Sequence, residues 1–534
     1  MRILPLRRDT GLSFVLNQFH PFQIKMTNIN FSFNKKITIA LILCQGISFN
    51  AFSHDGEDHG GSVTLAPGLP ECQILAAARL FDGVNFPQDN MAVLIEGDKI
   101  KRIGALAELS GSCANQINLG DATILPGFIE SHAHITFQGV NKNAVLEHGV
   151  TTVQDTGGPL QAKEGGDGTL RLLSAGPLIQ AAGGYPLNVF GGGDGGYDKI
   201  GIPVASTTEA DKVVADLIAG GATAIKMALE PGGETGAPWM QPHDGPVPET
   251  PWPMLSQDIA NAIVAKAHAL GKRVLVHAGE NTGFERALNA GVDEFAHIPC
   301  GEIREDLLQR AVDQGVTFVT TIDTLAACVN TATGKGIHSN TMSLASKGAK
   351  FIYGSEIGHD NVPWGINGEE LHMILHLTSG ESIDFTDVVN VIKSATSKAG
   401  EHLGLAPLGT LVAGAPADVI AVKGNPFQKF KLLEYPQLVI SGGRTIVNKL
   451  INQSSPASIE CFLTWAEGKY PELLSPAGQT TVVSSLYSYR YYPATQVYAG
   501  ISSADNHVYF MKQADGLLRS EGPLANWLPV SGCQ

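Results

Sequence analysis

The sequence predicts an α/β fold built around a (β/α)8 barrel, and three observations lead to it. Between residues 121 and 406, eight apolar runs with strand character are interleaved with helical patterns. Short strand-like runs flank this region on both sides. Six polar residues stand at or near the ends of apolar runs, which is where side chains meet at one mouth of a barrel. A chain of 534 residues has room for such a barrel and for further modules.

Residues 1–53 are typical of a secretory signal peptide. Two lysines precede the apolar run ITIALILC, and the tripeptide AFS at residues 51–53 offers a small-residue cleavage site. The run is shorter than the roughly 20 apolar residues that span a bilayer. A start at Met26 would give a signal of more ordinary length, and a buried N-terminal strand is the alternative for this run. We therefore expect an exported protein, periplasmic or extracellular, with no membrane span in its mature chain.

A small sheet is expected from segments on both sides of the barrel. Residues 54–71, beginning HDGEDHGG, form a polar leader that we expect to be flexible. Residues 72–120 follow with strand-like runs in CQILAAARLFDG, NMAVLIEGDKIKRIGA and NQINLGDATI. Residues 407–455 return to strand character, in Leu408–Val422 and Leu438–Asn448, and would complete the same sheet.

The barrel region, residues 121–406, supplies strands and helices in alternation. The expected strands are Ala122–Glu130, Val150–Thr156, Leu172–Ile179, Ala222–Leu229, Arg273–Ala278, Glu294–Ile298, Thr317–Ile322 and Phe351–Ser355. The expected helices are Thr207–Ala219, Ser256–Leu270, Asn281–Ala290, Arg304–Gln314 and Asn340–Lys350. Ser256 is a good N-cap for the second helix, and Gly271 is a good C-terminal stop for it.

Residues 456–534 differ in composition from the rest of the chain. The segments SLYSYRYYPATQVYAG and NHVYFMK are aromatic and rich in residues that favour strands. Cys461 and Cys533 bracket this segment, and we expect them to pair. The sequence therefore predicts a small, β-rich C-terminal module closed by a disulfide.

Six cysteines remain after removal of the signal, and an even number permits disulfides in an exported protein. Cys72 and Cys113 fall in one small N-terminal unit and form the second expected pair. Cys300 and Cys328 lie in the barrel, where we expect buried thiols.

The charge of the chain argues against two classes of partner. Residues 1–53 hold six Lys or Arg and one Asp, which leaves 30 basic and 50 acidic residues in the remainder. Such a surface repels nucleic acid and anionic membranes, so neither is an expected partner. A composition with 43% hydrophobic and 16% charged residues is that of a globular protein.

The pair His132 and His134 stands at the end of the first barrel run, in PGFIESHAH. Residues i and i+2 of a strand face the same way, so both imidazoles can bind one metal at about 2.1 Å. An isolated HxH pair is a weak signal. Its place before a loop strengthens it, because the C-terminal strand ends face the active site in this fold.

Lys226 lies within a strand-like run, ATAIKMAL, with Ala224 and Ala228 on its own face. A bare ammonium there would be unfavourable, and the small neighbours leave room beside the amine. Reaction with CO2 would turn the amine into a carbamate, an anionic oxygen donor that can bridge two cations. The alternative is a lysine at the barrel rim with its head in water. The histidines at other strand ends favour the carbamate.

Two more histidines and one acid complete the candidate site. His277, in RVLVHAG, and His297, in EFAHIP, each end a strand-like run, and together with the HxH pair they are better explained as metal ligands than as structural groups. Glu356, in YGSEIG, follows the last run, where a carboxylate can touch the metal, take a proton from water and pass it to a leaving nitrogen. A solvated loop acid is the alternative, and Asp360 is a nearby substitute. Tyr185, in GGYPLNVFGGG, is a candidate substrate contact or a packing residue.

These residues and the segments around them resemble the metal-dependent amidohydrolase superfamily. They are most similar to the branch that holds imidazolonepropionases, metal-dependent prolidases and Xaa-Arg dipeptidases. The resemblance covers about residues 72–450 and includes PGFIESHAH, GVTTVQDTGG, VLVHAGE, EFAHIPC, YGSEIG and ATSKAGEHLGLAPLGTLVAGAPADVIAVKGNP. It implies a distorted (β/α)8 barrel with a β-sandwich made from both flanks.

The resemblance also implies two divalent metal ions. His132 and His134 would hold the more buried ion, and Lys226 as a carbamate would bridge to a second ion held by His277 and His297. Mixed imidazole and oxygen ligands suit zinc, with manganese, iron or cobalt as alternatives. The family usually presents aspartate where this chain has Glu356. The extra methylene moves the carboxylate by about a bond length, and catalytic geometry tolerates little misplacement.

The implied activity is hydrolysis of an amide C–N bond by water that the metals activate, with Glu356 moving the proton. The expected substrate is small: an N-acyl amino acid, a dipeptide ending in proline or a basic residue, or a cyclic amide. Two alternatives remain open. One is an esterase or lactonase acting at the same site. The other is a barrel whose catalytic activity is impaired by glutamate at position 356 and which serves as a binding or surface protein.

Overall fold

The computed structural model describes residues 69–191, 199–232, 249–325, 336–449 and, with short gaps, 456–533. The expected signal peptide lies outside the described residues, as does nearly all of the expected leader. None of the helices within the described ranges combines the length and the apolar character needed to cross a bilayer.

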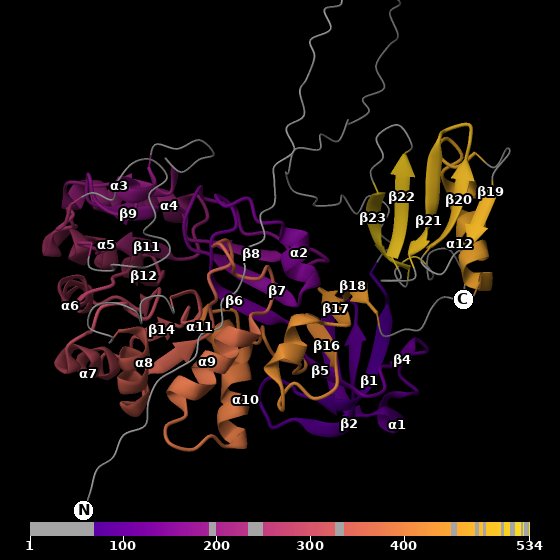
Figure 1. Ribbon diagram of the computed structural model, residues 1–534, viewed down its shortest axis with the longest axis horizontal. Helices are drawn as coiled ribbons and strands as arrows, with labels where there is room; N and C mark the ends of the chain where they lie inside the picture. The colour runs from indigo at the N-terminus through magenta and orange to yellow at the C-terminus, as the bar shows by residue number, and fades with distance from the viewer. Residues whose placement is uncertain are drawn as a thin grey trace, which may run out of the picture. The chain divides into compact units, whose positions relative to one another are not determined.

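An eight-stranded sheet combines strands from both sides of the central region (Figure 1). Its order is β18-β17-β16-β5-β1-β2-β3, and β4 pairs with β1. The strands are β1 (Cys72–Leu80), β2 (Gln88–Glu96), β3 (Lys99–Ala105), β4 (Gln116–Asn118), β5 (Ala122–Pro126), β16 (Val419–Lys423), β17 (Leu438–Ser441) and β18 (Arg444–Asn448). Alternate residues of β1 supply separate apolar clusters on the two faces, with Leu75 in one cluster and Ile74 in the other.

Two expected strands of this region need correction. The run Ala122–Glu130 is two strands, β5 in the flanking sheet and β6 (Phe128–Ala133) among the parallel strands. Gly127 separates them, and a Cβ at this position would lie only 2.2 Å from Oγ1 of Thr151, so the close approach needs glycine. The run Leu408–Val422 is strand only from Val419 onward, because the chain before it turns through glycines at positive φ.

The central region is a parallel α/β arrangement in two hydrogen-bonded sheets. One has the order β10-β9-β11-β12-β13-β14-β15, and the other has the order β6-β7-β8. An isolated parallel bridge between Ala133 and Ile357 connects the end of β6 to the segment after β15. The further strands are β7 (Val150–Asp155), β8 (Arg171–Ser174), β9 (Leu178–Gln180), β10 (Gly201–Pro203), β11 (Ile225–Ala228), β12 (Val274–His277), β13 (Glu294–Phe295), β14 (Thr317–Val319) and β15 (Lys350–Ile352).

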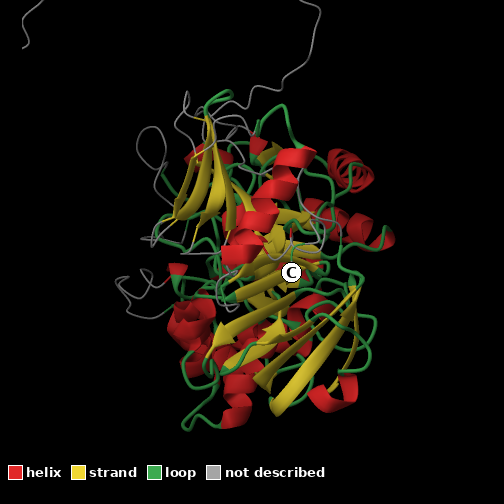
Figure 2. Cartoon of the chain, turned by 90° about the vertical axis from the view of Figure 1, so that its right-hand side faces the viewer, coloured by secondary structure: helices red, strands yellow, loops and turns green. Residues whose placement is uncertain are grey.

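The helices up to residue 402, drawn in red in Figure 2, include one between each strand and the next from β9 to β15. They are α1 (Leu106–Leu109), α2 (Lys142–Glu147), α3 (Leu187–Phe190), α4 (Thr207–Ala219), α5 (Gln257–Ala269), α6 (Asn281–Ala290), α7 (Glu305–Asp313), α8 (Ile337–Ser346), α9 (Gly368–Thr378), α10 (Phe385–Ser394) and α11 (Ser397–His402), with a 3-10 helix at Phe430–Glu434. The side chain of Ser256 caps α5 by accepting from the backbone of Ile259 at 3.3 Å, and Gly271 beyond its end has φ +69°. The expected helix Asn340–Lys350 lies earlier, as α8, and Lys350 begins β15.

Aromatic stacking fixes part of the core between helix and strands. The ring centroids of Phe284 and Phe295 lie 4.1 Å apart, and those of Phe295 and Phe318 lie 5.3 Å apart. All three side chains are fully buried. The stack therefore joins α6 to β14 and to β13, the strand that precedes His297.

The described part of the C-terminal segment includes a helix and an antiparallel sheet. Helix α12 (Pro456–Lys469) precedes the sheet β19-β20-β21-β22-β23, whose strands are Thr480–Val483, Tyr487–Tyr492, Val497–Ser502, His507–Lys512 and Leu518–Pro523. Arg490 is 2% exposed and pairs with Glu460 and Glu467 of the helix. Both expected disulfides, Cys72–Cys113 and Cys461–Cys533, are present.

Cys300 is also disulfide-bonded, so the expectation of a buried thiol at this position was wrong. Its side chain is 1% exposed, as expected for the barrel core. Sequence spacing could not indicate the bond, because a pairing depends on which cysteines the fold brings together. Cys328 lies outside the described residues.

Candidate metal centre

Six side chains singled out from the sequence come from parallel strands of the central region or from the residues just after them. His132 belongs to β6 and His134 follows it directly, Lys226 is in β11, and His277 ends β12. His297 comes two residues after β13, and Glu356 comes four residues after β15. Each of these six residues is at most 7% exposed. Strand ends that point the same way in a parallel sheet explain why residues so far apart in sequence converge.

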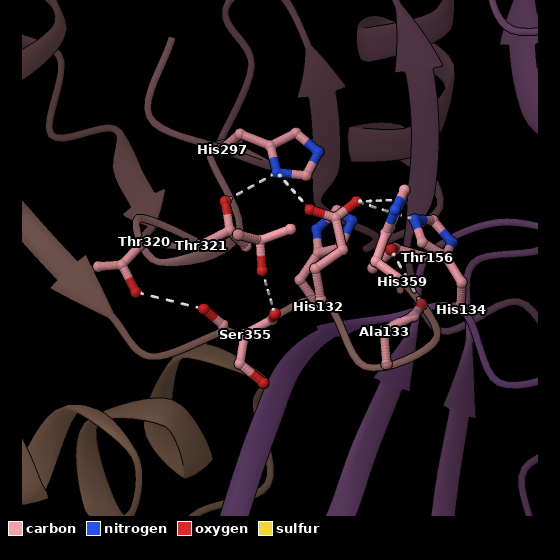
Figure 3. A network of polar contacts seen from close by, with 12 residues as sticks. His132, Ala133, His134, Thr156, His297, Thr320, Thr321, Ser355 and His359 are labelled. Carbon is pink, nitrogen blue, oxygen red and sulfur yellow. Dashed lines mark hydrogen bonds and ion pairs between the residues drawn. The ribbon is translucent and has the colours of Figure 1, made fainter. Parts of the chain in front are cut away.

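The carboxylate of Glu356 lies among three imidazoles. Oε1 is 3.3 Å from Nε2 of His134 and 3.3 Å from Nε2 of His359, while Oε2 is 3.5 Å from Nδ1 of His297. Figure 3 shows how His132, His134, His297 and His359 are grouped. Glu356 points into the cluster, whereas Asp360 is exposed and does not replace it.

Lys226 lies beside the first histidine. Its Nζ is 3.2 Å from Nε2 of His132 and 3.5 Å from Oγ1 of Thr156. The ring of His132 is in turn 4.4 Å from the ring of His297, measured between centroids. The amine of Lys226 is buried and belongs to the same polar cluster.

His277 and Tyr185 lie together at one side of the cluster. Their rings are stacked with centroids 4.5 Å apart, and the ring of His277 is 5.2 Å from that of His297. Nε2 of His277 is 3.9 Å from a carboxylate oxygen of the buried Glu230. Tyr185 also stacks on Trp252, so it has a packing role as well as a position at the site.

Two residues outside the predicted set hold the ligands in place. Oε1 of Glu130 accepts hydrogen bonds from the backbone N–H of His132 at 2.9 Å and of Ser355 at 2.8 Å, and Oε2 accepts from the Ser355 hydroxyl at 2.7 Å. One carboxyl group thus connects β6 to the residue before Glu356. The hydroxyl of Thr321 lies 2.9 Å from Nδ1 of His297.

Backbone strain coincides with the site. Thr321 has φ +45° and Glu356 has φ +67°. A β-branched residue rarely adopts the left-handed region, and such strain is usually retained where function needs it. Both residues contact histidines of the cluster.

Burial and the surrounding charges set the protonation of the cluster. Burial lowers the pKa of His132 and of His297 well below the ordinary value, and it lowers the pKa of His134 to about 4. Burial opposes ionisation of Glu356, but His297, His359 and His134 hold its pKa well below the ordinary value. Neutral imidazoles and an ionised carboxylate are the forms that bind a metal ion.

The donor set fits divalent metal ions. Within the described ranges, the ligand atoms of His132, His297 and Glu356 lie within 4.8 Å of one another, and so do those of His134, Glu356 and His359. The buried Nδ1 atoms of His132 and His134 have no hydrogen-bond partner among the described residues. His277 belongs to neither close group, although its ring lies 5.2 Å from that of His297, measured between centroids.

The cluster borders a cavity. Besides the polar residues, its lining includes apolar side chains from β9 and from the segments after β6 and β9, namely Leu178, Phe137, Tyr185, Pro186 and Phe190. A larger cavity, of about 570 Å³, lies at the amino ends of β14 and β15 and contains none of the six site residues. The chemistry of the smaller cavity makes it the candidate active site.

Three residues of the site escaped the sequence-based prediction: Glu130, Thr321 and His359. His359 could have been found, because it follows Glu356 by three residues and a turn there brings the two side chains together. Glu130 and Thr321 carry no comparable signal. Each lies in an apolar run. Glu130 contacts Ser355, which is remote in sequence, and Thr321 contacts His297, which follows another strand.

Comparisons with known proteins also indicate a hydrolase family. Residues 123–451 match the Amidohydrolase family. Ochratoxinase of Aspergillus niger is 26% identical over 196 residues, which are 34% of this chain and 39% of the relative. The aligned part thus spans about two fifths of the length of that relative.

Solved structures are similar over most of the chain. An Xaa-Pro dipeptidase with bound methionine is 22% identical, with a TM-score of 0.55, over 70% of this chain and 99% of that one. A putative prolidase from Bifidobacterium longum is 23% identical, with a TM-score of 0.55, over 71% and 95%. The A. niger ochratoxinase structure is 18% identical, with a TM-score of 0.56, over 70% and 95%. These similarities indicate a TIM-barrel-like α/β fold.

Proposed function

The chain belongs to the amidohydrolase family, and we propose that it is a metal-dependent hydrolase that cleaves an amide C–N bond in a small substrate. The names of its relatives, a dipeptidase, prolidases and an ochratoxinase, support this class. N-acyl amino acids, dipeptides ending in proline or a basic residue, and cyclic amides are the proposed substrates. The observation that carries the proposal is the position of the Glu356 carboxylate between the buried imidazoles of His134 and His297, beside a cavity.

Two divalent cations are the proposed cofactors, with zinc first and manganese, iron or cobalt as alternatives. His132, His134, Lys226, His277, His297 and Glu356 are the proposed ligands. Bound cations would polarise the substrate carbonyl and make a bound water easier to deprotonate.

Lys226 is proposed to carry CO2 as a carbamate. The amine is 2% exposed and lies 3.2 Å from an imidazole nitrogen of His132. As an ammonium it would repel a cation bound by that histidine. Carbamate formation requires the ammonium to lose one proton first. The neutral amine nitrogen then bonds to the carbon of CO2 and loses a second proton, so a positive group is replaced by an anionic oxygen donor.

The chain's own groups would then carry out three tasks. Glu356 takes a proton from the attacking water and delivers it to the leaving nitrogen. Glu130 and Thr321 hold the backbone and ring positions of the ligands. Tyr185, Phe137 and Phe190 offer apolar contacts to the substrate in the cavity.

A substrate panel tests the proposal. The purified chain, supplied with zinc, is offered N-acyl amino acids, Xaa-Pro and Xaa-Arg dipeptides, lactams and lactones. Hydrolysis of at least one amide, lost on treatment with a chelator, is the expected result. Hydrolysis of lactones alone would assign an esterase-type activity, and no hydrolysis of any compound would overturn the proposal.

Further proposals concern the architecture and the location of the protein. Residues 121–406 are proposed to form a distorted (β/α)8 barrel, flanked by a β-sandwich from residues 72–120 and 407–455. Export is proposed from the basic and apolar segment before residue 54 and is supported by disulfides at Cys72–Cys113 and Cys461–Cys533.

A further inference from the structure

We propose that His359 is a ligand of one of the cations, together with His134 and Glu356. The inference rests on the proposed function, because it concerns the same centre. It assigns to that centre a histidine that does not lie at the end of a strand.

The turn after β15 brings His359 to the site. Glu356 has φ +67° and Gly358 has φ +115°, and the backbone N–H of His359 donates to the carbonyl oxygen of Glu356 at 3.1 Å. This tight turn folds the chain back, so that the side chains of residues 356 and 359 meet. Any side chain at position 358 would clash, since a Cβ there would lie 2.6 Å from the carbonyl oxygen of His134.

The geometry is that of a three-ligand group. Nε2 of His359 and Nε2 of His134 each lie 3.3 Å from the same oxygen, Oε1 of Glu356. The centroids of the two imidazoles are 5.9 Å apart, so their nitrogens approach one carboxylate oxygen from different directions. Two imidazole nitrogens and one carboxylate oxygen are a common ligand set for zinc and related ions.

The second group uses the other carboxylate oxygen. Oε2 of Glu356 faces His297 at 3.5 Å, and His132 completes that group. The two groups therefore use different oxygens of one carboxylate, and among the described residues His359 is the third ligand beside His134 and Glu356.

The positions of the two groups differ in exposure. The side chain of His359 is 17% exposed, whereas that of His297 is 4% exposed. His359 lines the cavity, as do His134, His297 and Glu356, whereas His132 does not. By side-chain exposure, a cation held by His359 is the one nearer to solvent, and it should be the first to leave when a chelator is added.

Cobalt binding by the full chain tests the inference without depending on activity. The metal-free protein is loaded with Co²⁺, and the cobalt per chain, the visible absorption spectrum and the affinity are measured for wild type, His359→Asn and His359→Asp. His268→Asn is the matched control, because His268 is exposed and pairs with Asp293 at the amino end of β12. Circular dichroism establishes that each variant is folded.

We expect His359→Asn to lose about one cobalt per chain, or to bind it at least about tenfold more weakly. His359→Asp should retain the ion with a changed spectrum, because oxygen replaces nitrogen, and His268→Asn should match wild type. Unchanged cobalt content, affinity and spectrum in His359→Asn would overturn the inference alone. If that variant does not fold, an unchanged spectrum in His359→Asp overturns it. Wild type that binds no cobalt would overturn both this inference and the proposed function.

Discussion

Nζ of Lys226 lies 3.2 Å from Nε2 of His132, although the two residues are 94 positions apart and both are buried. An amine in contact with a ligand nitrogen has two very different electrostatic effects, depending on its chemical form. As an ammonium it opposes cation binding, and as a carbamate it promotes it. The state of this one side chain therefore decides how the cluster can work.

Replacement of Lys226 by methionine, which keeps much of the side-chain volume, removes both the amine and any carbamate. If the carbamate bridges the cations, metal affinity should fall at least about 100-fold and hydrolysis should fall with it. Metal analysis and native mass spectrometry measure the result, and wild type alone should carry the added mass of CO2. Full metal content in Lys226→Met would contradict the carbamate.

Convergence of the six predicted residues followed from a simple regularity. In parallel α/β proteins, functional side chains collect at the carboxyl ends of strands, and apolar runs mark those ends in the sequence. His277 ends β12 and His297 follows β13 closely, so both could be identified by this rule. Their burial and mutual contact agree with it.

The residues that sequence analysis missed do not obey that rule. Glu130 lies inside an apolar run and acts on Ser355, which is 225 residues away. His359 depends on a turn with two positive φ values, one of them at the non-glycine residue Glu356. Likewise, Ala122–Glu130 has the pattern of one strand, and only the contact of Gly127 with Thr151 shows that it divides between two sheets.

The length of the acidic side chain at position 356 determines which imidazoles its carboxylate can reach. The side chain of Glu356 reaches His134 on one side and His297 on the other. Glu356→Asp shortens the reach and should lower kcat by about 10- to 100-fold, while Glu356→Gln should lower it further because it cannot take a proton. Steady-state kinetics on a hydrolysed amide measure both effects. Activity that appears only in Glu356→Asp would instead identify an impaired enzyme.

Thr321 should act through His297. Its hydroxyl is 2.9 Å from Nδ1 of that ring and thereby fixes the orientation of the ring. Thr321→Val keeps the shape but loses the hydroxyl, so we expect metal affinity to fall about 10- to 100-fold. Thr321→Ser retains the hydroxyl and is the control. Equal affinities in Thr321→Val and wild type would show that the contact has no role in metal binding.

The buried acid Glu370 predicts a pH dependence of stability. Burial raises its pKa from 4.5 to about 7, so the folded state holds its proton more tightly than the unfolded state does. The contribution of protonated Glu370 to the free energy of unfolding is fully present below pH 4.5 and is lost as the pH rises through about 7. The free energy of unfolding of the metal-free protein should therefore fall across this range.

Glu370→Gln should remove up to about 1.4 kcal/mol per pH unit from that fall. Glu130 and Asp155, whose pKa values burial raises to about 8 and about 7, act in the same direction, so part of the slope should remain. Urea unfolding between pH 5 and pH 8, with a chelator present, measures the slopes. The same slope in wild type and Glu370→Gln would show that Glu370 does not titrate in this range.

The metal content of the purified chain, measured together with amide hydrolysis before and after chelation, decides whether the cluster is a catalytic metal centre. We predict at least one divalent ion per chain, loss of hydrolysis when the chelator removes it, and recovery when zinc, manganese or cobalt is restored. A chain that holds no divalent ion, or that hydrolyses its substrate equally well after the metal has been removed, would rule out a metal-dependent hydrolase.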